Sequence, residues 1–212
     1  MRVVALLSVC GLLASGMVAH AATVQYGETK AGGGSIVPAG VATSISSDNG
    51  FYVAPPESGD DSDPADWVWV GDTETTDIAT FEFTFDLTGL DLTSVVLQLD
   101  WSVDNFGWVE LDGGDGDIGT SDDVATLPDV TGNFSSIDSV TLTGASNFQP
   151  GENTLTFYLR DRFFDTAGDG GQAAFTAAVS VTATPIPLPA SLPLVVGGIA
   201  ALGLLRARRK KS

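Results

Sequence analysis

The sequence predicts an all-β fold, an antiparallel β-sandwich, on two observations. Short runs of alternating apolar and polar residues recur between residues 41 and 181, as in Phe81-Glu-Phe83-Thr-Phe85-Asp-Leu87. Clusters of Gly, Asn, Asp and Pro separate these runs, and no run has a convincing helical period. Regularly spaced short strands with such turn signals are typical of two sheets that turn their apolar faces toward each other.

Eight runs carry the strand prediction, six of them strong. The strong runs are residues 81–87, 95–101, 108–111, 140–143, 155–159 and 175–181, and the weaker ones are 41–45 and 67–70. All four Trp residues fall in these runs, so we expect them in the core or at its rim, with a sugar-stacking surface as the alternative. They are Trp67, Trp69, Trp101 and Trp108.

Residues 1–21 have the three parts of a secretory signal peptide. Arg2 precedes an apolar stretch over residues 3–18, and Ala19-His20-Ala21 is a small-x-small cleavage site. We therefore expect an N-terminal signal helix, export through the Sec translocon, and cleavage by signal peptidase after Ala21.

Cleavage there would remove the only Cys and the only His, Cys10 and His20. Cys nucleophiles, Ser-His-Asp triads, disulfides and His- or Cys-ligated metals are then excluded. Carboxylate chemistry remains, and a glycosidase needs only two carboxylates. Nearly all the acids lie in turns and loops, however, and we expect Glu82 and Glu110 on the strand faces opposite the aromatic residues. The sequence therefore favours a protein that is not an enzyme.

The region between the two ends is strongly acidic. All 27 acidic residues but only three basic ones, Lys30, Arg160 and Arg162, lie between residues 23 and 184, which gives that region a formal charge of -24. Such a surface repels phosphate backbones, so we expect no nucleic-acid partner. The acidity either keeps an exported protein soluble or serves to bind cations.

The densest group of acids is a Gly-rich stretch between residues 112 and 123. Calcium takes six to eight oxygen ligands, often from closely spaced Asp side chains and backbone carbonyls. The spacing matches neither an EF-hand loop nor a repeated nonapeptide, so a solvated loop without metal is the alternative. The candidate calcium ligands are Asp112, Asp115, Asp117, Asp122 and Asp123.

Residues 185–212 have three parts. Residues 185–189 are Pro-rich and stay extended, residues 190–205 are uncharged, and residues 206–211 carry five basic side chains. As a helix, the uncharged run is about 24 Å long against a hydrocarbon core of roughly 30 Å. It predicts a short transmembrane helix with its C-terminus in the cytoplasm and the body outside. A permanent single-pass anchor and a sorting signal both fit.

The order of these three parts resembles the PEP-CTERM family of bacterial sorting signals. Residues 186–190, Ile-Pro-Leu-Pro-Ala, resemble the VPLPA-CTERM variant, with Ile186 in place of Val. The resemblance implies that exosortase, a membrane protease and transpeptidase, recognises this box and cuts near it. The recognised positions would be Pro187, Leu188, Pro189 and Ala190.

A second resemblance covers residues 81–181. The stretches 83–90, 99–113 and 148–157 resemble the ectodomain often found ahead of such tails and the galactose-binding-like jelly rolls of many carbohydrate-binding modules. Asp112 stands where that pattern usually has Asn. We therefore expect a signal peptide over 1–21, a jelly-roll-like ectodomain over 22–184 and a sorting signal over 185–212.

Together these features predict an exported bacterial protein, held briefly at the inner membrane and then placed at the cell surface or in the extracellular matrix. The family resemblance implies a non-enzymatic partner of exopolysaccharide in a biofilm, with calcium bridging Asp loops to anionic sugars. The residues that would bind glycan are not assigned. The alternatives are a self-assembling structural surface protein and a simple single-pass anchored protein.

Overall fold

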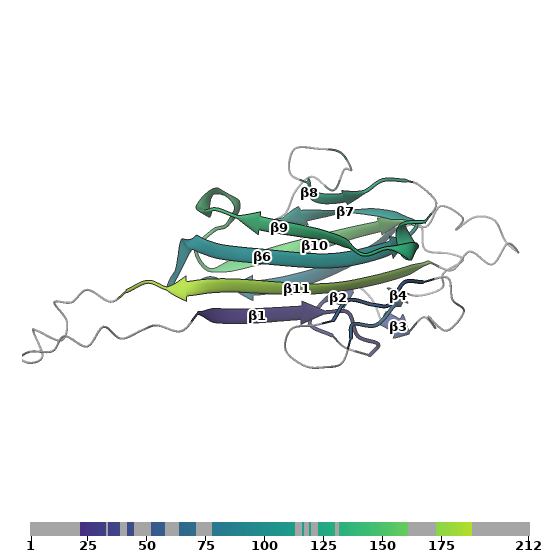
Figure 1. Ribbon diagram of the computed structural model, residues 1–212, viewed down its shortest axis with the longest axis horizontal. Coiled ribbons are helices and arrows are strands. Elements are labelled where there is room, and N and C mark those ends of the chain that lie inside the picture. Colours follow the sequence, from purple (N-terminus) through teal and green to yellow (C-terminus); the bar gives the residue numbers. More distant parts are fainter. Residues whose placement is uncertain are drawn as a thin grey trace, which may run out of the picture.

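The computed structural model describes residues 22–32, 34–38, 42–44, 52–57, 64–70, 78–112, 116, 119, 123–129, 132–160 and 173–187. There the chain forms two antiparallel sheets that pack face to face (Figure 1), which confirms the predicted all-β sandwich. The predicted signal helix and transmembrane helix lie outside the described residues. The helices within them are two short 3-10 turns, η1 (Asn133–Ser135) and η2 (Ala145–Asn147), and neither is long and apolar enough to cross a membrane.

The larger sheet has six strands in the order β3-β4-β11-β6-β9, with β1 also paired to β11. The smaller sheet has five strands in the order β2-β5-β10-β7-β8. The six-stranded sheet contains β1 (Thr23–Glu28), β3 (Ala42–Ser44), β4 (Val68–Val70), β6 (Leu90–Asp104), β9 (Asp138–Thr143) and β11 (Ala174–Pro185). The five-stranded sheet contains β2 (Val37–Pro38), β5 (Ile78–Asp86), β7 (Phe106–Leu111), β8 (Asp123–Leu127) and β10 (Glu152–Arg160).

The strand pairs are nested along the chain. The outermost pair is β1–β11, and β5–β10, β6–β9 and β7–β8 follow inward, all antiparallel. Folding this nested set over itself places β6 beside β11 and β7 beside β10. The last strand therefore lies at the centre of its sheet.

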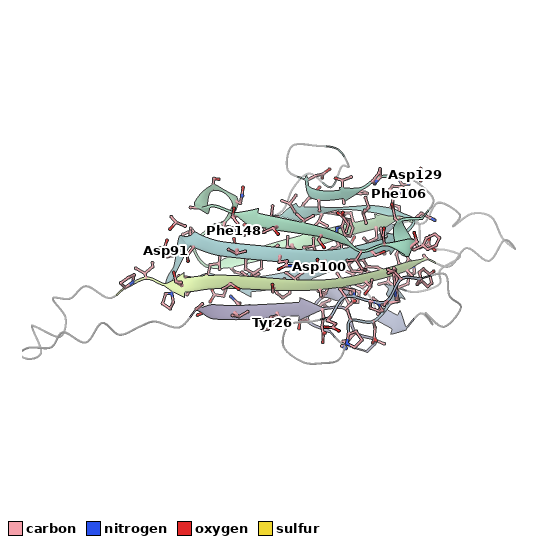
Figure 2. All side chains as sticks on the ribbon, in the orientation of Figure 1. Tyr26, Asp91, Asp100, Phe106, Asp129 and Phe148 are labelled. Carbon is pink, nitrogen blue, oxygen red and sulfur yellow. The ribbon has the colours of Figure 1, made fainter. Side chains whose placement is uncertain are left out.

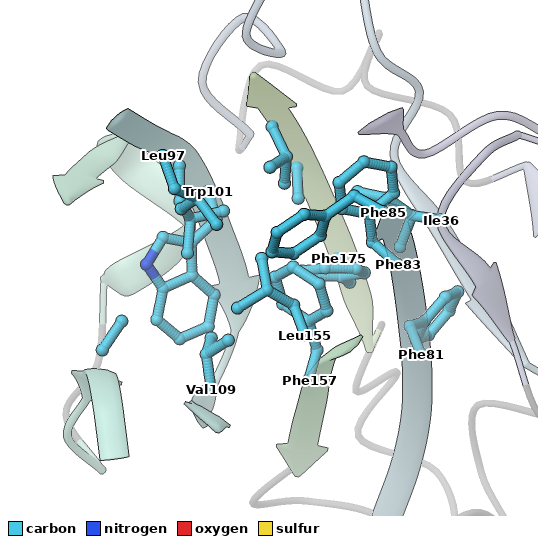
Figure 3. Close-up of a cluster of buried hydrophobic side chains, with 14 of the residues drawn as sticks. Ile36, Phe81, Phe83, Phe85, Leu97, Trp101, Val109, Leu155, Phe157 and Phe175 are labelled. Carbon is cyan, nitrogen blue, oxygen red and sulfur yellow. The ribbon is translucent and has the colours of Figure 1, made fainter. Parts of the chain in front are cut away.

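Period-two alternation fills the space between the sheets. On β5, Phe81, Phe83 and Phe85 are buried while Glu82 and Thr84 between them are exposed. Figure 3 shows the aromatic residues of both sheets in one cluster. The Phe157 ring centroid lies 5.1 Å from that of Phe175 and 6.4 Å from that of Trp101, in tilted and edge-on geometries that favour aromatic pairs.

All eight predicted runs contribute to strands, but β1, β2 and β8 were not predicted. In β1, Gly27 stands at an inward position where the pattern calls for an apolar side chain. The structure gives the reason, because a Cβ at Gly27 would overlap the ring of Phe83. The strand β1 can therefore be identified only when its packing against the opposite sheet is known.

The β-sandwich between residues 22 and 184, called the body below, begins and ends at the same end of the six-stranded sheet. Thr23 pairs with Ala183, and Pro185 pairs with Leu90. The N–H of Ile186 then donates to the carbonyl of Gly89 at 3.0 Å. The backbone pairing thus continues into the first residues of the predicted sorting signal.

Candidate functional site

Two of the five predicted calcium ligands are described, and both carboxylates accept hydrogen bonds within the chain. Asp112 ends the β7 region with a φ of 58°, which Asp tolerates, and its Oδ1 accepts the N–H of Thr154 at 2.8 Å. Asp123 is the first residue of β8, and its Oδ2 accepts the N–H of Gly119 and the hydroxyl of Thr126. Asp115, Asp117 and Asp122 lie outside the described residues.

The described residues contain no group of three or more potential metal-ligating side chains. Glu110 does lie close to the β7–β8 connection, because it pairs with Asp123 across the two strands. Its side chain is fully buried, and its Oε1 accepts the N–H of Gly116 at 2.8 Å. The carboxylates of Glu110 and Asp123 therefore bind the backbone of Gly116 and Gly119, two of the described residues between the two strands.

The prediction that Glu110 lies opposite the aromatic residues holds for the rings of the main core but not for Trp108. Glu110 shares its face of β7 with Trp108, because Val109 between them is the residue that joins the core. Trp108 stacks on Tyr158 of β10 with ring centroids 5.3 Å apart. Glu82, in contrast, is exposed on the face opposite Phe81 and Phe83, as expected.

The four Trp side chains are all buried, which confirms their expected place in the core or at its rim. Trp69 and Trp101 belong to the main core, and Trp67 packs against Tyr52 in a smaller cluster at the β4 end. Trp108 is only 4% exposed. None of them offers an open surface on which a sugar could stack.

A groove that the sequence did not predict lies on the outer face of the six-stranded sheet. It is open to solvent and has a volume of about 290 Å³. Figure 2 shows Tyr26 on β1 and Asp100 on β6, the two strands that flank β11. The groove is lined by Tyr26, Glu57, Gln98, Asp100, Ala178, Val179 and Ser180.

The strand register explains the shape of the groove. Ser180 of β11 pairs with Tyr26 on one side and Gln98 on the other, and Ala178 pairs with Asp100. The central strand contributes short side chains and the flanking strands contribute long ones. The face is therefore hollow along β11.

Most polar groups of the groove are available to a ligand. Within the described part of the chain, the side chains of Tyr26, Gln98 and Ser180 make no hydrogen bond, whereas Oδ1 of Asp100 accepts the hydroxyl of Ser139 at 2.5 Å. A phenol, an amide, a hydroxyl and carboxylates beside an aromatic ring are groups that can bind a polyhydroxylated ligand.

Sequence reasoning missed this groove because its lining comes from four separate segments of the chain. Tyr26 lies on a strand that was not predicted, and Glu57 comes from a connecting segment. The one available signal was the run of short residues, Ala178 and Ser180, on the polar side of the predicted strand 175–181.

Of the predicted processing residues, Pro187 is described and follows the end of β11. Ala19, Ala21, Leu188, Pro189 and Ala190 lie outside the described residues. In comparisons with known proteins, no family model matches the chain, and no curated protein matches it significantly.

Proposed function

We propose that the protein is an exported, non-enzymatic glycan-binding component of a bacterial cell surface or exopolysaccharide matrix. The observation that carries this proposal is the polar groove on the six-stranded sheet. Tyr26 supplies a ring for stacking, and Gln98, Ser180 and Asp100 supply hydrogen-bonding groups beside it.

The strand order supports assignment of the body to the jelly-roll class. Four nested antiparallel pairs, β1–β11, β5–β10, β6–β9 and β7–β8, are what a long hairpin produces when it is rolled into two sheets. The expected galactose-binding-like relationship is consistent with this order. A fold of this class hosts many functions, so the groove and not the fold carries the proposal.

The position of the chain ends supports the proposed sorting. The predicted signal peptidase product begins at Ala22, and the predicted exosortase box begins after Pro185, at the same end of one sheet. A body with both ends on one side can stay close to the membrane on which Sec export and exosortase act. Cleavage in the box would then release it, or transfer it, to the surface or matrix.

Calcium is the proposed cofactor of the acidic connection between β7 and β8. Asp112 and Asp123 stand at its two ends, so the three further Asp residues between them would complete an oxygen-ligand set. Bound calcium would link this connection to anionic sugars.

The test is binding of the full chain, in a non-glycosidic detergent, to the producer's own exopolysaccharide, with calcium and then with chelator. We expect saturable binding that Gln98→Ala weakens. Gln149→Ala is the matched control, since Gln149 is an exposed Gln in the turn before β10. Absence of binding in both conditions rejects the proposal. If the exopolysaccharide binds with calcium but not with chelator, the binding is assigned to the acidic connection between β7 and β8.

One observation favours self-assembly as the second candidate. β9 is an edge strand of the six-stranded sheet, and the side chains Ser139, Thr141 and Thr143 on its exposed face are uncharged. Such an edge can pair with a strand of another copy. Light scattering against calcium concentration tests this, since growth of particles without glycan supports self-assembly and a constant monomer mass rejects it.

A further inference from the structure

We propose that the groove on the six-stranded sheet binds an amino-sugar unit whose free amine is protonated, in a glycan such as a deacetylated hexosamine polymer. This inference rests on the proposed glycan binding and specifies the class of sugar that the groove selects.

The charges around the groove are the first argument. Its ionisable lining comprises the carboxylates of Glu57 and Asp100 and the phenol of Tyr26, with no basic side chain in the lining. Lys30, a described cation outside the lining, lies 3.9 Å from the carboxylate of Glu28 and donates to the carbonyl of Pro64. Glu28 occupies the β1 position opposite Ala178. An ammonium group is stabilised beside such carboxylates, whereas a uronate or a sulfate is repelled.

The arrangement along the strands is the second argument. Tyr26, Ser180 and Gln98 lie in one row across β1, β11 and β6, and Asp100 lies in the row two residues further along β6. Two residues of a strand span about 7 Å. That separation suits a sugar ring that rests against Tyr26 with its hydroxyls toward Gln98 and its amine toward Asp100.

Asp100 is held in a defined position, which is the third argument. Its Oδ1 accepts the hydroxyl of Ser139 on the neighbouring strand β9 at 2.5 Å, and Asp100 also pairs with Ser139 through the backbone register. The second carboxylate oxygen can therefore meet an ammonium group without a large loss of side-chain freedom.

The region between residues 23 and 184 has a formal charge of -24, so a polycation would also bind it without using the groove. The test therefore uses short oligomers and charge-matched variants. The full chain, in a non-glycosidic detergent and at physiological ionic strength, is titrated by calorimetry with a glucosamine trisaccharide and with the N-acetylated trisaccharide of the same length. Both titrations are repeated with chelator, which leaves the groove intact because its lining does not include the β7–β8 connection.

We expect the glucosamine trisaccharide to bind at least about tenfold more tightly than its acetylated form, the factor typical of one charge-assisted hydrogen bond. Asp100→Asn, which keeps an oxygen for the Ser139 hydroxyl, and Glu57→Gln should each remove most of that preference. Glu82→Gln removes the same charge from an exposed strand position on the other sheet and should leave the affinity within twofold.

The amino-sugar inference would be overturned if both oligomers bound with equal affinity. It would also be overturned if Asp100→Asn and Glu82→Gln lowered the affinity for the glucosamine trisaccharide equally. No binding of the glucosamine oligomer would also overturn it. Glycan binding itself survives those results if the exopolysaccharide still binds and Gln98→Ala still weakens that binding, and it fails together with the inference if the exopolysaccharide does not bind either.

Discussion

Thr23 lies directly opposite Ala183, because β1 and β11 pair in antiparallel register from this point to Glu28 and Ala178. The first strand after the predicted signal peptide therefore stands beside the last strand before the predicted sorting box. The sheet that carries the groove can be completed only after residues 174–185 have been synthesised, since β11 also provides the floor of that groove.

The close approach of Gly27 to Phe83 predicts a stability effect. We expect Gly27→Val to lower the free energy of unfolding by about 1–3 kcal/mol, because the added side chain overpacks the core against the Phe83 ring. Urea unfolding followed by Trp fluorescence measures it. Thr23→Val, at an exposed position of the same strand, should change stability by less than about 0.5 kcal/mol. In a protein that already carries Phe83→Leu, Gly27→Val should lower the free energy of unfolding by less than it does alone. If the effects of the two substitutions simply add, the predicted clash between the two positions is wrong.

Phe157 is the clearest core position, since it packs against aromatic rings of the opposite sheet. Phe157→Ala should cost about 3–5 kcal/mol through lost burial and a residual cavity. Chemical denaturation with two spectroscopic probes checks this value and the two-state assumption. Val37→Ala is the control, because Val37 is 56% exposed. A similar loss in both variants would mean that the core assignment is wrong.

Asn153 organises the turn that leads into β10. Its Nδ2 donates to the carbonyls of Gln149 and Gly151, both at 2.9 Å, and its Oδ1 accepts the N–H of Gln149 at 3.0 Å. Because the side chain is 1% exposed, Asn153→Ala should cost about 1–3 kcal/mol by removing three part-buried hydrogen bonds that hold the turn. Asn147 is exposed and its side chain donates one such bond, to the carbonyl of Thr143. In a thermal melt, Asn147→Ala should therefore lower the melting temperature less than Asn153→Ala does.

The carboxyl of Asp91 predicts a pH effect. The hydroxyl of Thr93, followed by its backbone N–H, donates to this carboxylate and lowers the pKa of Asp91 below its usual value of 3.8. A lowered folded-state pKa stabilises the protein above about pH 4 and ceases to do so as the pH falls through the folded-state pKa. Thr93→Ala should move the pKa of Asp91 back up in an NMR titration. Asp86, whose pKa Thr88 lowers in the same way, is the internal control and should not move.

The strands that could be predicted are those whose alternation is complete within one segment. Residues 81–87 and 155–159 show a full period of two, so their inward and outward faces were assigned correctly. β8 was not predicted because its run, Asp123–Leu127, follows directly on an acidic stretch that is typical of a loop. Glu110 was expected opposite all the aromatic residues, but it lies two residues from Trp108, and a period of two places both side chains on one face of β7.

The sequence by itself determined the all-β class, most of the strands and the excess of negative charge, because alternation and composition are local properties. It also predicts the export and sorting segments. Only the tertiary structure decided that Gly27 is an inward strand position and that Tyr26, Ser180 and Gln98 form one row. The physical reason is that these residues are brought together by pairing between β1, β11 and β6, whose register depends on packing against the opposite sheet and leaves no mark in any one segment.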